Sequence, residues 1–288
     1  MAKQPLAEVF GFPLPNMGKE ACRHRENRLC PFNNKVPNCT KDKANNPLGV
    51  CSILNDDGEV IITCPVRFRQ GWIIAEDAAS FFFPPKTKWT TLTEVRLRDK
   101  YDKSAGNIDV VLVSYDDRGK VTGFGALEVQ AVYITGNVRN PFEHYMEDPQ
   151  GWQRMDWQGH PNYPHADYLS SSRKRLAPQM IFKGGIFKVW GKRTAVALNS
   201  GFFNTLPKLE EVAKDKADVA WLIYDLVHEK DVFTLTKVRE VYTKFNESLE
   251  KITRSEAGDV KHFVELLQEK VHDKLENPPD TEAIDATF

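Results

Sequence analysis

NIDVVLVSYDDRGKVTGFGALEVQAV, residues 107–132, contains two runs of strand-forming residues separated by a polar turn with a glycine. Apolar and β-branched residues fill both runs, and the turn DDRGK favours a β-hairpin. With Arg118-Gly119 as a two-residue loop, counting back along both strands places Asp109 opposite Glu128. Gln130 lies two residues beyond Glu128 and therefore on the same face of the sheet. The hairpin thus predicts a face that carries two carboxyl groups and an amide.

These two carboxyl groups allow two interpretations. Directly opposed residues have Cβ atoms about 4.5–5.5 Å apart, so two carboxylates there repel each other. A divalent cation reverses the sign, because Mg²⁺ prefers carboxylate and water oxygens. Alternatively, Asp109, Glu128 and Gln130 belong to an ordinary solvated face of a two-stranded ribbon. Spacing alone leaves both interpretations open.

The composition is that of an ordinary globular protein, with 41% hydrophobic and 27% charged residues among 288. The formal net charge of -1 gives no overall indication of nucleic-acid binding. Positive charge is local, because residues 168–209 contain eight Lys or Arg and no Asp or Glu. The N-terminus lacks the pattern of a signal peptide, and no apolar run approaches the roughly 18 residues of a membrane helix. We therefore expect a cytoplasmic protein without a membrane partner.

Residues 1–75 form the first of three regions that we distinguish by composition. Many Cys, Pro, Asn and basic residues surround one predicted hairpin at 50–63. The region has too little apolar sequence for a core of its own, so something else must hold it together.

Residues 76–206 form the second region, which contains the hairpin with the two carboxyl groups, and residues 207–288 form a third, helical region. In the second region, a helical pattern from Trp89 to Val95 includes Glu94. Further along, the sequence predicts a long loop at 137–168, a short helix at 171–182 and a strand at 194–198. In the third region, helices are predicted at 207–228, 234–252 and 258–275.

Five cysteines lie in the first region: Cys22, Cys30, Cys39, Cys51 and Cys64. No two of them form a C-x-x-C pair, so free thiols and a metal site that staples the region are both open. Cys22 lies in a predicted helix, whereas the others precede a proline, lie in a turn or start a strand. We therefore assign Cys30, Cys39, Cys51 and Cys64 to the metal. Four thiolates suit zinc or iron, and their chemistry alone favours structural zinc.

An Asp on one strand followed by an acid-x-Lys on the next resembles the signature of the PD-(D/E)xK nucleases. Asp109 matches the first position and Glu128 the second, but Gln130 stands where most of that superfamily carries Lys. Other segments add weight: CRHRENRLCPFNNKVPNCTKDKANNPLGVCSI at 22–53, RLAPQMIFKGG at 175–185 and GFFNTLP at 201–207. In this order, residues 10–207 resemble the NotI family of type II restriction endonucleases.

The resemblance implies an α/β (α+β) fold. A PD-(D/E)xK core with helices flanking a mixed sheet would follow a small metal-binding region with four cysteine ligands and precede a helical part. It also implies Mg²⁺-dependent cutting of double-stranded DNA by a homodimer, at a GC-rich palindrome, and iron rather than zinc at the cysteines. Asp109 and Glu128 would hold Mg²⁺, which polarises the scissile phosphate and activates water. Gln130 would orient that water, and Glu94 would add a carboxylate from the side.

Two basic clusters are candidates for contacts to DNA phosphates and guanine bases. They are Arg23, Arg25 and Arg28 near the first cysteine, and Arg173, Lys174 and Arg175 in the acid-free stretch. A solubilising surface is the alternative for both. Trp152, Trp157 and His160 would line the cleft, although packing is the commoner role of aromatic residues.

Two rival functions remain at this point. The first is a metal-stapled DNA-binding protein without catalysis, and the second is a repair or structure-specific nuclease on the same core. Incubation with plasmid DNA and Mg²⁺ separates them from a restriction endonuclease, because the outcomes are no cut, sequence-independent nicking and discrete bands.

Overall fold

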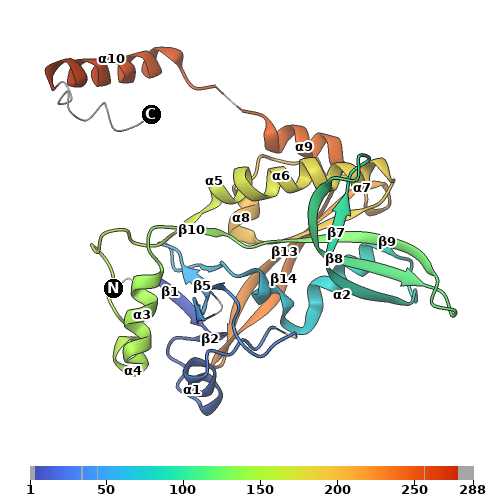
Figure 1. Ribbon diagram of the computed structural model, residues 1–288, viewed down its shortest axis with the longest axis horizontal. Coiled ribbons are helices and arrows are strands. Elements are labelled where there is room, and N and C mark those ends of the chain that lie inside the picture. The colour runs from blue at the N-terminus through green and yellow to red at the C-terminus, as the bar shows by residue number, and fades with distance from the viewer. Residues whose placement is uncertain (1–3, 34, 44, 256, 278–288) are drawn as a thin grey trace. The chain divides into compact units, whose positions relative to one another are not determined.

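Figure 1 shows the computed structural model, which describes residues 4–33, 35–43, 45–255 and 257–277. The chain divides into two compact units, residues 1–252 and residues 253–288. No helix within these described ranges is both long and apolar enough to cross a membrane. The first unit contains every candidate site residue.

Among the described residues, a six-stranded mixed sheet forms the centre of the first unit, in the order β14-β13-β12-β9-β8-β7. Strand β9 pairs in parallel with β12, and β12 with β13, whereas the remaining pairings are antiparallel. The strands are β7 (Trp89–Arg98), β8 (Ser104–Tyr115), β9 (Val121–Gln130), β12 (Thr194–Asn199), β13 (Val219–Glu229) and β14 (Val232–Thr243). The predicted mixed α/β architecture and the strand at 194–198 are confirmed.

The β8–β9 hairpin keeps the predicted register at the carboxyl groups, although its turn differs from the prediction. The loop is one residue longer than the predicted two-residue loop, and Gly119 adopts a left-handed φ of 77°. A bulge next to the turn then shifts the register back by one residue. Val110 consequently pairs with Leu127, which leaves Asp109 opposite Glu128.

Helices cover both faces of the central sheet (Figure 1). Helix α2 (Ile73–Phe82) packs on the face that carries Leu127 and Val129. The other face lies under an unbroken helical run that we call the covering helix, residues 168–189. It consists of α5 (Tyr168–Ser170), α6 (Ala177–Gln179) and α7 (Gly185–Val189), joined by π-helical turns at Ser171–Leu176 and Met180–Gly184.

The covering helix confirms the predicted short helix at 171–182 and extends it at both ends. Pro178 lies inside it, and a proline within a helix removes one backbone hydrogen bond and crowds the preceding turn. Wide turns on either side of such a residue relieve this crowding. The wide turns also change which side chains point at the sheet.

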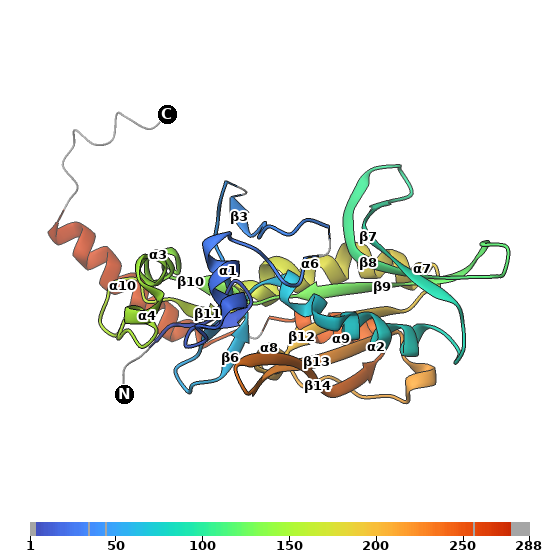
Figure 2. The same cartoon turned by 90° about the horizontal axis from the view of Figure 1, so that it is seen from below.

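The core of the central sheet holds residues 1–75 in place. Four strands form a separate sheet in the order β2-β1-β5-β6, and β5–β6 is the predicted hairpin at 50–63. Leu6 and Ile53 of this sheet share one hydrophobic core with Leu198 and Trp221 of the central sheet. Strand β6 lies next to β13 of the central sheet (Figure 2). The bounds are β1 (Leu6–Val9), β2 (Phe12–Pro13), β5 (Val50–Leu54) and β6 (Val60–Ile62).

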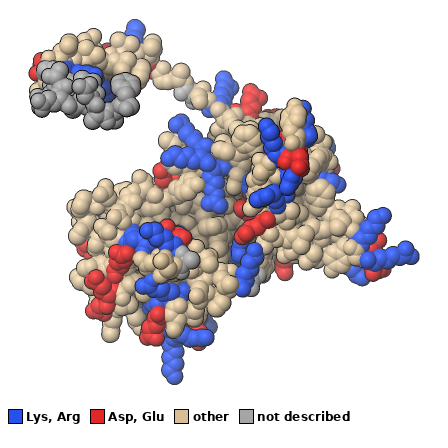
Figure 3. All heavy atoms as spheres, in the orientation of Figure 1, with Lys and Arg blue, Asp and Glu red and all other residues tan. Residues whose placement is uncertain are grey.

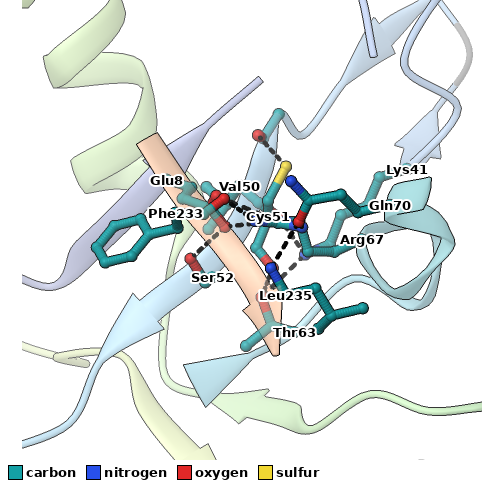
Figure 4. Close-up of polar contacts among 11 residues, drawn as sticks. Glu8, Lys41, Val50, Cys51, Ser52, Thr63, Arg67, Gln70, Phe233 and Leu235 are labelled. Carbon is teal, nitrogen blue, oxygen red and sulfur yellow. Dashed lines mark hydrogen bonds and ion pairs between the residues drawn. The ribbon is translucent and has the colours of Figure 1, made fainter. Parts of the chain in front are cut away.

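A buried ion pair also ties this region to β14 (Figure 4). The Arg67 Nε lies 3.0 Å from the Glu8 Oε2, and both side chains are fully buried. Arg67 also donates to the carbonyl of Phe233 and to Gln70 Oε1, each at 2.8 Å. Gln70 Oε1 in turn accepts from the Leu235 N–H at 2.7 Å. The two charges are therefore paired and hydrogen-bonded, which limits the cost of burying them.

Three helical predictions are wrong. Strand β13 occupies residues 219–228 of the predicted helix at 207–228, and β14 occupies residues 234–243 of the predicted helix at 234–252, whose residues from Phe245 onward are helical. An apolar run such as AWLIY fits a buried helix and a buried strand equally well, and pairing within the sheet decides between them. The pattern at Trp89–Val95 is strand β7, whose alternate residues are exposed. Helices α9 (Phe245–Thr253) and α10 (Val260–Glu276) are the helical parts of the third region.

Short elements connect these parts. The segment predicted as a loop at 137–168 contains two helices, α3 (Arg139–Glu147) and α4 (Pro149–Trp152), and is therefore more ordered than expected. The others are α1 (Lys19–Glu26), β3 (Asp42–Lys43), β4 (Asn46–Pro47), η1 (Pro65–Trp72), β10 (Tyr133–Thr135), β11 (His165–Asp167), α8 (Ser200–Asn204) and η4 (Lys214–Lys216).

Candidate active site

The predicted carboxylate pair forms at the middle of the central sheet. Asp109 on β8 is half-buried, and its Oδ2 accepts a hydrogen bond from the Val129 N–H at 2.9 Å. Glu128 on β9 is only 4% exposed, and its Oε1 has no hydrogen-bond partner among the described residues. A solvated ribbon face is therefore excluded, because the covering helix lies over this face. The orphaned oxygen is an acceptor that a cation or a donor can satisfy.

The electrostatic environment of Glu128 favours a cation. Burial raises the pKa of Glu128 to about 8, the nearby charge of Asp109 adds to the rise, and Lys183 lowers it only in part. A buried carboxylate beside a second carboxylate holds its proton because its charged form is poorly compensated. A divalent cation between the two groups would remove this penalty. The pair therefore fits Mg²⁺ by donor type and by its unsatisfied oxygen.

Lys183 is a site residue that the sequence pattern did not identify. It lies in the covering helix, is 8% exposed, and its Nζ donates to Glu128 Oε2 at 2.6 Å. The same ammonium donates to the main-chain carbonyl of Asn107 at 2.7 Å. The segment RLAPQMIFKGG contains this lysine, but nothing local in it shows which strand the lysine meets.

Gln130 lies on the same face as Glu128 and is fully buried. Its Nε2 donates to Gln179 Oε1 of the covering helix, and its own Oε1 has no partner within the described part of the chain. Gln179 and Lys183 are four residues apart and so share one side of the helix. This side presents an amide to Gln130 and an ammonium to Glu128.

Glu94 is not brought to the carboxylate pair. It lies on β7 between residues that pair with the neighbours of Asp109, so it is level with Asp109 in the sheet. Its φ of 57° interrupts the strand, and its side chain is 63% exposed, with Oε1 3.8 Å from Lys35 Nζ. Among the described residues, no group of three or more Asp, Glu, His or Cys side chains is arranged to hold a metal. The expected third carboxylate therefore points to solvent.

The covering helix leaves almost no space above the pair. The cavity lined by Glu128, Gln130 and Lys183 measures about 10 Å³, no more than one water molecule needs. A cavity of about 770 Å³ lies elsewhere, lined by residues that include Leu6 and Asp225 and by neither of the paired carboxylates. We place the candidate active site beside the smaller cavity, because Glu128 lines it and Asp109, which is half-buried on the neighbouring strand, stays partly open to solvent.

The four cysteines assigned to a metal lie near one another. Burial raises the pKa of the Cys30 thiol to about 11, with Cys64 and Cys39 adding to the rise. Burial also raises the pKa of Cys51, and Cys64 is again a neighbour. Cys22 lies apart from these four, beside Arg25 and Tyr145, and donates to the Met17 carbonyl at 3.5 Å. All five are free thiols, and since no ligand group is assembled in the described ranges, the metal site is not confirmed.

Arg25 is a correction to the predicted DNA contacts. It is 3% exposed, and its guanidinium donates to the carbonyls of Asn16 at 2.6 Å and Pro13 at 2.8 Å and lies over the Tyr145 ring. The short α1 helix turns this side chain inward, so it is not free to bind phosphate. Its guanidinium instead fixes the chain before α1.

The other predicted basic residues are more accessible. Arg23, Arg28, Arg173 and Lys174 are exposed, and Arg175 is half-buried. Arg23 lies 3.6 Å from Glu20, and Arg28 donates to Asn46 Oδ1 at 2.7 Å. Figure 3 shows the face of the protein that is turned to the viewer in Figure 1. Basic side chains lie there in several separate groups, with acidic side chains between them. Positive charge is therefore local on the surface, as the sequence predicted.

Two of the three aromatic candidates in the 137–168 segment pack on a histidine of that segment. His144 lies against Trp152 and Trp157, with ring centroids 4.1 Å and 5.5 Å apart, and Trp157 stacks on His160 at 4.1 Å. Packing within this small cluster therefore explains why the segment contains these aromatic residues.

Comparison with known proteins gives one family. Residues 9–237 match the family model described as Restriction endonuclease NotI. The match includes strands β2, β5 and β6 of the N-terminal sheet, the carboxylate pair, the covering helix and the start of β14, and it leaves out most of β1 and all of α9 and α10. A search of curated proteins found no match.

Proposed function

The chain belongs to the NotI family of restriction endonucleases and is a site-specific deoxyribonuclease, and from this we propose that it hydrolyses double-stranded DNA with Mg²⁺ at Asp109 and Glu128. One observation carries the proposal: the two carboxylates oppose each other in a fixed register, and one buried oxygen of Glu128 lacks a partner within the described chain. Two such groups destabilise a sheet unless a cation joins them.

The order of elements supports a PD-(D/E)xK core. Helix α2 precedes the antiparallel strands β7, β8 and β9, then the covering helix crosses the sheet, and β12 returns parallel to β9. Asp109 lies on the second of the three strands and Glu128 on the third, as the signature requires. We keep 1–75, 76–206 and 207–288 as the proposed functional regions around this core.

The reaction needs few groups from the protein. A bond forms between a water oxygen and the scissile phosphorus, the bond from phosphorus to the leaving deoxyribose oxygen breaks, the water loses a proton to solvent, and the leaving oxygen takes one up. Mg²⁺, when bound by Asp109 and Glu128, polarises the phosphate and lowers the pKa of the water. The unpartnered Oε1 of Gln130 accepts a hydrogen bond from that water and orients it.

We assign DNA binding to the exposed basic residues of α1 and of the covering helix. Arg173 and Lys174 lie on the helix that carries Lys183. If these two side chains bind DNA phosphates, they place the DNA backbone near the carboxylate pair. A homodimer would present two such sites to a palindrome, which we expect to be GC-rich. Arg23 and Arg28 would contact phosphate beside the cysteine region.

The test is incubation of wild-type protein with mixed-sequence plasmid DNA, with Mg²⁺ or with EDTA. Discrete bands that require Mg²⁺ support the proposal. Shifted but uncut DNA would indicate a binding protein without catalysis, and a smear of nicked products would indicate a structure-specific or repair nuclease. Both outcomes contradict a type II restriction endonuclease.

A further inference from the structure

The catalytic strand lacks a lysine at position 130, yet an ammonium group lies at the carboxylate pair. We propose that Lys183 supplies to the reacting phosphate the positive charge that Gln130 cannot supply. Lys183 is then a catalytic residue delivered from the covering helix rather than from the strand. This inference rests on the proposed function, because it concerns the same phosphodiester hydrolysis.

The contacts of Lys183 fix its ammonium beside the carboxylates. Nζ donates to Glu128 Oε2 at 2.6 Å and to the Asn107 carbonyl at 2.7 Å. Asn107 is two residues before Asp109 on β8, so the ammonium bridges the same two strands as the carboxylate pair. An ammonium has three N–H donors, and these contacts use two of them. The third can serve a phosphate oxygen.

The local backbone is shaped to bring Lys183 to this position. The lysine lies in the π-helical turn Met180–Gly184, and single π-turns within α-helices are frequent at functional sites. On β8, Gly106 has a φ of 101°, and a Cβ there would lie 3.7 Å from the Lys183 Cε. The lysine stem therefore runs past a position without a side chain. At this distance a Cβ at position 106 would make an ordinary van der Waals contact, so the stem of Lys183 packs directly along the β8 backbone at Gly106.

A count of charges separates a catalytic role from a purely structural ion pair. When both carboxyl groups are ionised, as cation binding requires, two carboxylates face one ammonium, so the metal-free site has a net negative charge and Glu128 Oε1 lacks a partner among the described residues. With a divalent cation bound, the charges of the two carboxylates and the cation sum to zero, and the charge of Lys183 then makes the site positive. A positive site is complementary to a phosphate that gains negative charge in the transition state. Without Lys183 the site is neutral, because Gln130 adds no charge.

Lys188 offers a matched comparison on the same helix. Its Nζ lies 2.8 Å from Asp218 Oδ2, and this pair is more exposed than that of Lys183 and Glu128. Lys188 contacts neither Asp109 nor Glu128 among the interactions of the described residues. Replacing Lys188 removes an ion pair from the helix without changing the charge beside Asp109 and Glu128.

The experiment measures single-turnover cleavage of plasmid DNA with Mg²⁺ and DNA affinity with Ca²⁺. The proteins are wild type, Lys183→Met, Lys188→Met and the double variant Lys183→Met/Gln130→Lys. We expect Lys183→Met to cut at least about a hundredfold more slowly, equivalent to ~2.7 kcal/mol at 1.36 kcal/mol per decade. Its DNA affinity should stay within about threefold of wild type, since phosphate affinity comes from many exposed cations. Lys188→Met should cut at close to the wild-type rate.

The double variant decides between a supplied charge and a structural role. If Lys183 acts by its charge at the phosphate, a lysine at position 130 should restore cleavage to within about tenfold of wild type. Cleavage by Lys183→Met within about threefold of wild type, or a double variant as slow as the single one, overturns the inference. Should Lys183→Met melt at a lower temperature, Lys183→Arg keeps the charge and must cut faster than Lys183→Met, or the inference is wrong. A wild-type protein that cuts no DNA overturns the proposed function itself, whereas the other failures leave it standing.

Discussion

At the scale of single residues, Glu128 has the most unusual environment among the candidate catalytic groups. It is buried, it lies beside Asp109, and one of its oxygens has no partner among the described residues. Lys183 compensates its charge only in part, and the pKa of Glu128 is therefore raised to about 8. When such a residue is ionised, it lowers the stability of the metal-free protein, and a bound cation restores that stability.

The first prediction concerns the pH dependence of stability. The folded-state pKa of Glu128, about 8, lies above its ordinary value of 4.5, so the folded protein holds this proton more tightly than the unfolded chain does. The contribution of the protonated group is fully present below pH 4.5 and is lost as the pH rises toward 8. In EDTA, wild type should therefore lose stability between pH 5 and pH 8 relative to Glu128→Gln. Urea denaturation at both pH values measures this.

Mg²⁺ provides the second arm of that experiment. At pH 8, added Mg²⁺ should stabilise wild type but not Glu128→Gln, because the cation binds the native carboxylate pair. Parallel pH profiles for the two proteins, or equal stabilisation by Mg²⁺, would show that Glu128 is not the cation ligand.

Gln130 is the subject of the second prediction. Gln130→Glu keeps the size of the side chain but adds a third carboxylate beside Asp109 and Glu128 and removes a donor. We expect single-turnover cleavage to fall by at least about a hundredfold, or roughly 2.7 kcal/mol. Gln130→Leu removes the water-orienting oxygen without adding charge and should also be slow. If Gln130→Leu cuts within about threefold of wild type, Gln130 is an ordinary strand residue.

Sequence reasoning predicted the strand half of the candidate site but not the helix half. Asp109, Glu128 and Gln130 follow from a hairpin, in which the alternation of side chains and one turn decide every contact. Lys183 follows the hairpin by more than fifty residues, and its contact with Glu128 depends on how the covering helix crosses the sheet. No local pattern encodes that crossing. The prediction that Glu94 adds a carboxylate to the pair assumed a helix at Trp89–Val95. This segment is strand β7, and Glu94 itself has a left-handed φ that interrupts the strand.

At the scale of elements, two strands near the C-terminus of the first unit account for the largest error of sequence reasoning. Strands β13 and β14 complete the central sheet, and β13 is apolar along most of its length because both of its faces are covered. Such a run lacks the alternation that identifies a strand. Hairpins with a clear turn, at 50–63 and 104–130, were predictable because turn chemistry and alternation agree.

The third prediction tests the ion pair that joins the N-terminal sheet to β14. Arg67→Met should lower the free energy of unfolding by about 3–5 kcal/mol, because Glu8 is then left buried and unpaired. The double variant Arg67→Met/Glu8→Leu should recover much of this loss, since neither charge remains. As a control, Arg239→Met breaks an exposed pair with Glu211 and should cost no more than about 1 kcal/mol. Equal losses in the single and double variants would contradict a buried pair.

At the scale of the whole molecule, a nuclease sheet and a cysteine-rich segment share one hydrophobic core. The core explains how residues 1–75 are held without a metal, which weakens the argument that a staple is required. The four thiols are neighbours and are ligands of the right type for zinc or iron, although the described residues do not assemble them into a ligand group. We therefore retain the structural metal as a proposal that rests on Cys30, Cys39, Cys51 and Cys64.

The fourth prediction is the metal content of the purified protein. Elemental analysis should find about one iron or zinc per chain, since four thiolates complete one tetrahedral site. Cys64→Ser should reduce this content, whereas Cys22→Ser should leave it unchanged, because Cys22 lies beside Arg25 and Tyr145 and not among the other four cysteines. Protein without iron or zinc would show that the cysteines are buried thiols.

The carboxylate pair is the central claim, and single-turnover cleavage by Asp109→Ala, Glu128→Ala and Glu94→Ala tests it most directly. With Mg²⁺, the first two variants should not cut DNA, yet with Ca²⁺ they should bind it with near wild-type affinity. Glu94→Ala should cut at close to the wild-type rate, because its carboxylate is exposed and pairs with Lys35. Full cutting by Asp109→Ala or Glu128→Ala would contradict the account, since the reaction would then take place elsewhere.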